Sequence, residues 1–147
     1  GLPLVPCHVF PTNAPAAFFS VHALKDPGLA TKLAAFLKAG KPVLLTDGLA
    51  AQLAGKHDLP DAPQVQILPI KGDPKSLLEL TQEKLDALRE ALLRPWQCHF
   101  RAPNRVALYL FKDGSRVVEN FNDEAVKVEF NGKPVTIASR HWSHQWK

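Results

Sequence analysis

The stretch AAFFSVHALKDPGLATKLAAFLKAGKPVLLTD (Ala16–Asp47) decides the fold class of this chain of 147 residues. Two short apolar runs, FFSV and PVLL, flank an amphipathic segment whose apolar residues recur at the spacing of one helix face. Asp26 is the predicted cap of this helix, Gly40 suits the left-handed residue that closes it, and Pro42 prevents its continuation. Two buried strands joined by a crossover helix pair in parallel with a right-handed connection. The stretch therefore predicts a strand–helix–strand unit of an α/β fold.

The alternation of predicted strands and helices continues as far as residue 103. Residues 48–55 read as a short helix that a glycine ends, and residues 65–68 read as a third strand. Residues 82–93 have helical periodicity, and Pro95 stops that helix. We expect residues 1–103 to form one small parallel α/β unit.

After residue 103 the hydrophobic period changes from that of a helix to that of a strand. Asp113-Gly114 and Asn131-Gly132 are strong signals for tight hairpin turns. Residues 104–147 therefore predict an antiparallel β-meander, which either packs on the α/β unit or completes a small β-sandwich with strands supplied from elsewhere. The four predicted strands cover residues 106–111, 116–121, 126–130 and 135–138.

Composition limits the classes of partner. With 46% hydrophobic and 22% charged residues, the chain can bury a core and should be soluble. No apolar run approaches the ~20 residues of a membrane helix, so no membrane contact is expected. Residues 1–103 hold 11 basic and 9 acidic side chains, and residues 104–147 hold 7 and 5. Because no basic stripe results, no nucleic-acid partner is expected.

Two polar residues follow the first two predicted parallel strands. His22 follows the first strand and Asp47 follows the second. Ligands of open parallel sheets bind outside the carboxyl ends of the strands, so the two side chains are weak candidates for a catalytic pair. The simpler interpretation is that His22 is a loop residue and that Asp47-Gly48 caps and turns the chain into the next helix.

The tail RHWSHQW (Arg140–Trp146) is rich in rings. In an extended chain Trp142, His144 and Trp146 share one face, and the indoles are separated by about 13 Å. Such rings can stack on the apolar face of a sugar, or they can cover apolar surface where the chain ends. A helical tail would instead bring His141 next to His144, but two ligands do not make a metal site, so no metal is expected.

Cys7 and Cys98 are the two cysteines. They form a disulfide that closes a long loop, or they are two separate buried thiols, and the sequence leaves both alternatives open. Two cysteines do not fix the compartment, for which a periplasmic or secreted location is favoured over the cytoplasm.

Recognised catalytic motifs are missing from the sequence. It contains no G-x-S-x-G elbow, phosphate-binding glycine loop, H-E-x-x-H or C-x-x-C, so no cofactor is expected. The paired carboxylates Asp58/Asp61 and Asp123/Glu124 have the composition of solvated turns rather than of a glycosidase pair.

Two long runs resemble the C-terminal region of large bacterial glycoside-hydrolase-like proteins. They are LATKLAAFLKAGKPVLLTDGLAAQL (Leu29–Leu53) and VALYLFKDGSRVVENFNDEAVKVEFNGKPV (Val106–Val135). In that family an amidotransferase-like α/β domain, as in the β-galactosidase trimerisation domain, precedes a small β-domain. The resemblance implies a flavodoxin- or amidotransferase-like layer. It also implies that amidotransferase chemistry is absent, because Thr46-Asp47-Gly48 stands where the nucleophilic cysteine would be.

The sequence favours a non-catalytic accessory or assembly module of a larger carbohydrate-active protein. Its expected partners are an upstream catalytic domain or a second subunit. Two alternatives stay open: a small hydrolase that uses His22 and Asp47, and a sugar-binding module that uses Trp142 and Trp146.

Overall fold

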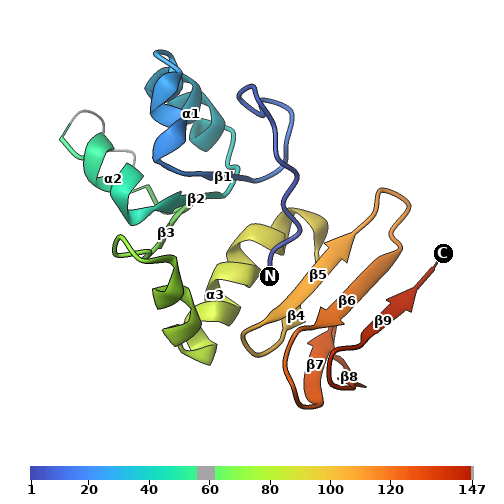
Figure 1. The fold of residues 1–147 in the computed structure, drawn as a ribbon. Coiled ribbons are helices and arrows are strands. Elements are labelled where there is room, and N and C mark those ends of the chain that lie inside the picture. Colours follow the sequence, from blue (N-terminus) through green and yellow to red (C-terminus); the bar gives the residue numbers. More distant parts are fainter. Residues whose placement is uncertain (56–61, 147) are drawn as a thin grey trace. The chain divides into compact units, whose positions relative to one another are not determined.

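The computed structural model describes residues 1–55 and 62–146, so Asp58 and Asp61 lie outside the described residues (Figure 1). The chain divides into two compact units. An α/β unit contains residues 6–79 and 91–96, and a β-rich unit contains residues 1–5, 80–90 and 97–147. Residues 1–5, 80–90 and 97–103, which we expected in the α/β unit, thus lie with the β-rich unit.

The α/β unit contains a three-stranded parallel sheet with the order β1-β2-β3. Phe19 of β1 is opposite Leu45 of β2, which is opposite Ile67 of β3. The predicted parallel arrangement of the two strands around the first helix is therefore confirmed. The elements of this unit are β1 (Ala17–Phe19), a 3₁₀ helix (Val21–Lys25), α1 (Leu29–Lys38), β2 (Val43–Thr46), α2 (Asp47–Leu53), β3 (Val65–Leu68) and a second 3₁₀ helix (Pro74–Glu79).

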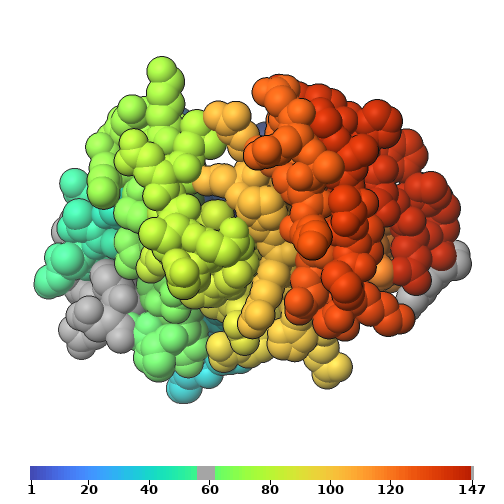
Figure 2. Space-filling view, turned by 90° about the horizontal axis from the view of Figure 1, so that it is seen from below, coloured from blue at the N-terminus to red at the C-terminus, as the bar shows by residue number. Residues whose placement is uncertain are grey.

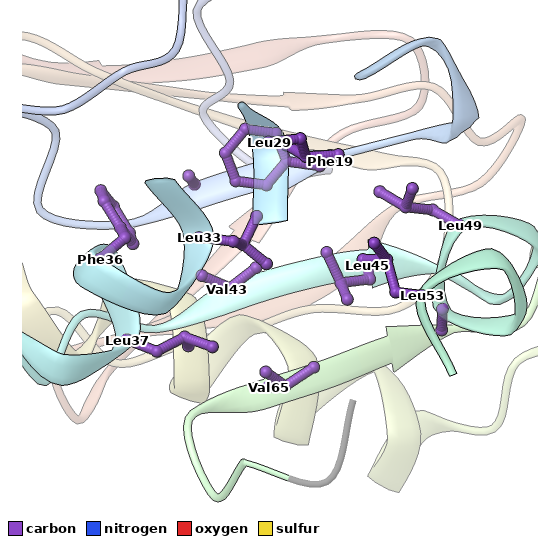
Figure 3. Close-up of a cluster of buried hydrophobic side chains, with 12 residues drawn as sticks. Phe19, Leu29, Leu33, Phe36, Leu37, Val43, Leu45, Leu49, Leu53 and Val65 are labelled. Atoms are coloured by element: carbon purple, nitrogen blue, oxygen red, sulfur yellow. The ribbon is translucent and has the colours of Figure 1, made fainter. Parts of the chain in front are cut away.

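Both helices of this unit pack on one face of the sheet. Alternate strand residues, including Phe19, Val43 and Leu45, form a single buried cluster with the apolar faces of α1 and α2. Figure 3 shows Leu33 of α1 beside Val43, and Leu53 of α2 beside Leu45. Strand alternation sends these side chains to the same side and Leu44 to the opposite side, where it is also fully buried. Burial on both faces explains why the central strand is apolar throughout.

The prediction for α1 is wrong at its first residue and right at its last turn. The predicted cap Asp26 is wrong: Gly28 occupies the N-cap position, and Asp26 Oδ1 accepts a hydrogen bond from the Gly28 N–H at 2.9 Å. Gly40 has a φ of 74°. Its N–H donates to Leu37 O at 2.8 Å and the Lys41 N–H donates to Phe36 O at 3.4 Å, the pair of bonds that closes a Schellman motif.

The β-rich unit contains two three-stranded antiparallel sheets, ordered β4-β7-β8 and β5-β6-β9. Both predicted hairpins are present, but the single meander is wrong because β6 and β7 lie in different sheets. Each hairpin is completed by a strand from outside the four predicted ones. Of α3 (Gln82–Leu93), residues 82–90 belong to this unit, whereas residues 91–93 and the following 3₁₀ helix (Arg94–Trp96) belong to the α/β unit. The strands are β4 (Phe100–Arg101), β5 (Val106–Leu110), β6 (Arg116–Asn120), β7 (Val126–Phe130), β8 (Lys133–Ile137) and β9 (Trp142–Gln145).

Asn120 connects the two sheets at the point where the chain passes from one to the other. Its side chain is 1% exposed, and Nδ2 donates to Ala138 O at 2.9 Å and to Glu124 O at 2.8 Å. Oδ1 accepts from the Asn122 N–H at 2.9 Å. Since a buried amide is costly unless its hydrogen bonds are made, this network fixes the path of the chain between β6 and β7.

Candidate functional site: an aromatic sheet face

The C-terminal tail forms an edge strand of the β5-β6-β9 sheet. β9 pairs antiparallel with β6, so that Trp142 is opposite Glu119 and His144 is opposite Val117. Side chains alternate along a strand, and Trp142, His144 and the following Trp146 therefore lie on one side of the sheet. The extended alternative for the tail is confirmed. Figure 2 shows these C-terminal residues, in dark red, at the surface of the β-rich unit.

The three rings follow one another at a regular spacing. The ring centroids of Trp142 and His144 are 5.2 Å apart, and those of His144 and Trp146 are also 5.2 Å apart. The ring planes differ by 47° and 41° at the two steps. The indoles are 57% and 59% exposed, although large apolar side chains are usually buried. Because His144 lies 5.2 Å from each of them, the two indole rings are closer together than the ~13 Å that backbone spacing alone predicts.

The strand on the other side of β6 extends this surface. Tyr109 is opposite Val117, which is opposite His144, so Tyr109 lies in the same row as the central ring. Phe111 follows β5, and its ring centroid is 6.0 Å from that of Trp146. We name this surface the aromatic face and define it by Tyr109, Phe111, Trp142, His144 and Trp146.

The opposite side of the same sheet is the core side. Val106 and Leu108 of β5 are 1% exposed, and Val118 of β6 is also buried. Arg116 of β6 stacks its guanidinium on the Phe130 ring of the other sheet, 3.9 Å from the centroid. The sheet thus buries one side while it presents rings on the other.

A polar pair lies among the rings. The Tyr109 hydroxyl donates a hydrogen bond to Glu119 Oε2 at 3.1 Å. Glu119 is opposite Ala107 on one side and Trp142 on the other, so its carboxylate lies in the row that begins the ring series. The hydrogen bond to Glu119, with smaller effects of burial and of the carboxylate charge, raises the pKa of Tyr109.

Sequence reasoning found Trp142 and Trp146 but missed Tyr109, Phe111 and Glu119. In the tail, the alternation of aromatic and polar residues can be read from the sequence, because polar residues separate the rings. The run Val106–Phe111 is almost wholly apolar, and such a run does not reveal which side chains face solvent. The hairpin signal at Asp113-Gly114 was the feature that could have paired Tyr109 with Val117.

The other predicted pair lies in the α/β unit, where the structure assigns Asp47 to the backbone. Asp47 Oδ1 accepts from the Gly48 N–H at 2.9 Å, and Oδ2 accepts from the Lys71 N–H at 2.7 Å. These bonds, that from Lys71 foremost, hold the pKa of the Asp47 carboxyl below its ordinary value. The expectation that Asp47-Gly48 caps α2 is wrong, because Thr46 is the N-cap and Asp47 is the first residue of the helix. The bond from Lys71 instead ties the turn after β3 to the end of β2.

His22 lies in the 3₁₀ helix after β1 and is exposed. The order β1-β2-β3 runs without the reversal that opens a ligand crevice at a switch point of an open sheet. A catalytic role for His22 and Asp47 stays a prediction that these three strands do not favour.

Cys7 is an exposed free thiol of the α/β unit, and Cys98 is a buried free thiol of the β-rich unit. The disulfide between them stays a prediction. Burial raises the pKa of the Cys98 thiol, and the charge of Arg116 offsets this only in part.

The β-rich unit also contains a pocket of about 330 Å³. In the part of the chain that the structure describes, no three histidine, cysteine or carboxylate side chains are grouped so as to hold a metal ion. None of the described helices is both long and apolar enough to cross a bilayer. The residues that line the pocket are Asp86, Glu90, His99, Phe100, Arg101, Glu129 and Gly132.

Comparison with known proteins adds no family: no family model, no curated protein and no solved structure matches this chain. We therefore infer the function from the residues of the aromatic face.

Proposed function

We propose that this chain is a non-catalytic accessory module of a larger, carbohydrate-active bacterial protein, and that the aromatic face binds a saccharide. The observation that carries the proposal is the series Trp142, His144 and Trp146, with successive ring centroids 5.2 Å apart and both indoles more than half exposed. The resemblance to glycoside-hydrolase-like proteins supports the same class of ligand.

The chemistry of a sugar ring suits such a surface. One face of a pyranose is lined by C–H groups, and these pack against the electron-rich face of an indole. Hydroxyl groups at the edge of the sugar need hydrogen-bond partners, which Tyr109 and Glu119 offer beside the rings. A surface that combines exposed rings with a polar pair among them matches both requirements.

The same proposal extends to the α/β unit, which we regard as a reduced amidotransferase-like layer without a nucleophile. Its support is the direct passage from β2 into α2, where Thr46 Oγ1 accepts from the Leu49 N–H at 3.3 Å. Thr46 and Asp47 at this strand–helix junction bind backbone N–H groups, a structural role in place of catalysis. We place the whole protein in the periplasm or outside the cell.

Affinity electrophoresis in gels that contain single soluble polysaccharides tests the saccharide proposal. We expect at least one neutral polysaccharide to retard the chain, and we expect Trp142→Ala and Trp146→Ala each to weaken that retardation at least tenfold. A tenfold loss corresponds to about 1.4 kcal/mol, within the ~0.5–1.5 kcal/mol that one aromatic pair contributes beyond the apolar area it buries. Trp96→Ala is the matched control, because Trp96 is 49% exposed and lies in the α/β unit. Equal retardation of all four proteins would overturn the proposal.

Assembly is the second candidate function, and the exposure of the same rings favours it. Two indoles and a phenyl ring on one sheet face form the kind of apolar surface that often marks a protein interface. The occupant would be a second subunit or the upstream catalytic domain. Sedimentation equilibrium over a wide range of protein concentration distinguishes the two functions. Self-association that Trp142→Ala abolishes supports assembly, and a monomer at all concentrations contradicts its second-subunit form.

A further inference from the structure

We propose that Glu119, held by Tyr109, makes the aromatic face selective for neutral saccharides over those that carry carboxylate groups. This inference rests on the proposed saccharide function and specifies its ligand. Three features of the sheet support it: the register position of Glu119, the contact that holds its carboxylate, and the charge of the strands.

The register places Glu119 at the first ring of the series. Glu119 is opposite Trp142 in the β6–β9 pair, and directly opposed residues on one face of an antiparallel pair have side chains in reach of each other. A sugar that stacks on the Trp142 indole therefore brings its edge hydroxyls to the Glu119 carboxylate. Hydrogen bonds from hydroxyls to an ionised carboxylate are among the stronger polar contacts available at a surface.

Tyr109 holds this carboxylate in place. Tyr109 lies on the neighbouring strand, diagonal to Glu119, and its hydroxyl reaches Oε2 at 3.1 Å. A fixed carboxylate loses less side-chain entropy when it binds than a freely rotating one, so the pair is prepared for a ligand. Burial of the Tyr109 ring is incomplete, at 44% exposure, which leaves the pair accessible.

The charge of the strands gives the selectivity. β5, β6 and β9 are described in full, and within them Glu119 is the one carboxylate. Arg116 is the one lysine or arginine of these strands, and its guanidinium is stacked on Phe130 of the other sheet. The sheet therefore meets a bound ligand with a negative charge beside Trp142, which accepts hydroxyl protons and repels a second carboxylate.

The test uses two probes that share a backbone and differ in charge, polygalacturonate and its methyl ester. Xyloglucan, galactomannan and a β-galactan are further neutral probes. The proteins are the unchanged chain, Glu119→Gln and Tyr109→Phe, with Glu129→Gln as a control because Glu129 lies in the other sheet. Retention by each probe is measured in affinity gels, and thermal midpoints confirm that each variant is folded.

We expect the unchanged chain to bind its best neutral probe at least fivefold more tightly than polygalacturonate, the effect of one like charge about 4 Å away in water. Glu119→Gln should reduce this preference to less than twofold. Tyr109→Phe should weaken neutral binding a few-fold and keep the preference, since the carboxylate remains. Glu129→Gln should change neither quantity.

The failures of the two proposals can be told apart. Equal binding of neutral and acidic probes by the unchanged chain, or an unchanged preference in Glu119→Gln, overturns the selectivity while the saccharide function stands. If the unchanged chain binds none of the five probes, the saccharide function is overturned and the selectivity with it.

Discussion

The hydroxyl of Tyr109 donates to Oε2 of Glu119 across the β5–β6 pair, at a distance of 3.1 Å between the two oxygens. The contact joins two residues that are ten positions apart in the sequence, and it exists because the hairpin register sets Tyr109 opposite Val117. It places a phenol and a carboxylate together on the exposed side of a sheet whose other side is core.

The first prediction concerns the ionisation of Tyr109, which is the chain's one tyrosine. Its hydrogen bond to Glu119 favours the neutral phenol, so its pKa is raised above the ordinary value. The ultraviolet absorbance of tyrosinate should therefore show a single transition above pH 10. Glu119→Gln should lower this pKa towards the ordinary value, and Glu129→Gln should leave it unchanged.

The sign of the linked change in stability follows from the same shift. The folded state binds the phenolic proton more tightly than the unfolded state does. The stabilisation is therefore fully present below the unfolded pKa and is lost as the pH rises through the folded pKa. A tyrosine transition at the pKa of a free phenol would show that the hydrogen bond is not formed in solution.

The parallel unit could be predicted because its signals are local. The helical spacing from Leu29 to Leu37, the glycine at 40 and the proline at 42 each act within a few residues of the position they specify. Together they fixed α1 to within two residues at each end, and the two apolar runs then had to pair across it. The error at Asp26 was small in sequence: two residues separate it from the true N-cap.

The division into two sheets could not be predicted, because it depends on pairings between distant strands. Both hairpins are signalled by their turns, but the second partner of β6 is β9 and the second partner of β7 is β4. In the structure Asn120 binds carbonyl groups near the end of β8 and so carries the chain from one sheet to the other, a role that no local pattern expresses.

For the same reason, only part of the candidate site could be predicted from the sequence. Trp142 and Trp146 stand out by composition, and their common side follows from alternation alone. Tyr109 and Glu119 joined them only through the register of three strands. A site composed of residues from several strands can be identified once the pairing of those strands is known.

A second prediction tests the end of α1. Gly40 has a φ of 74°, and a Cβ built on it would meet nothing within 4 Å, so the cost of a side chain is conformational alone. Gly40→Ala should lower the free energy of unfolding by about 1 kcal/mol. Gly40→Asn should lower the free energy of unfolding by less than half that amount, because asparagine tolerates the left-handed region. Denaturant unfolding measures both, and equal losses would show that something other than the backbone angle sets the cost.

A third prediction concerns Asp47 as a structural acid. Its carboxylate accepts two backbone N–H groups, and its pKa is lowered mainly by the bond from Lys71. The stabilisation it supplies is present above the unfolded pKa of about 4 and is lost as the pH falls through the lower folded pKa. Asp47→Asn should therefore reduce the denaturant midpoint at neutral pH and have little effect at the lowest pH at which the chain folds. His22→Ala should leave the midpoint unchanged, whereas a coupled loss in both variants would point to a His22–Asp47 interaction.

The fourth prediction separates the two thiols by their reactivity. Thiolate is the reactive form of cysteine. Cys98 is 6% exposed, and burial raises the pKa of its thiol, whereas Cys7 is exposed. An aromatic disulfide reagent should modify one thiol quickly in the native chain and the second only as fast as the β-rich unit opens. Cys7→Ser should remove the fast phase and leave the slow phase as it was. Denaturant should merge the two phases, because the unfolded chain exposes both side chains. A chain purified without reductant in which neither thiol reacts, even when unfolded, would instead establish the disulfide between Cys7 and Cys98.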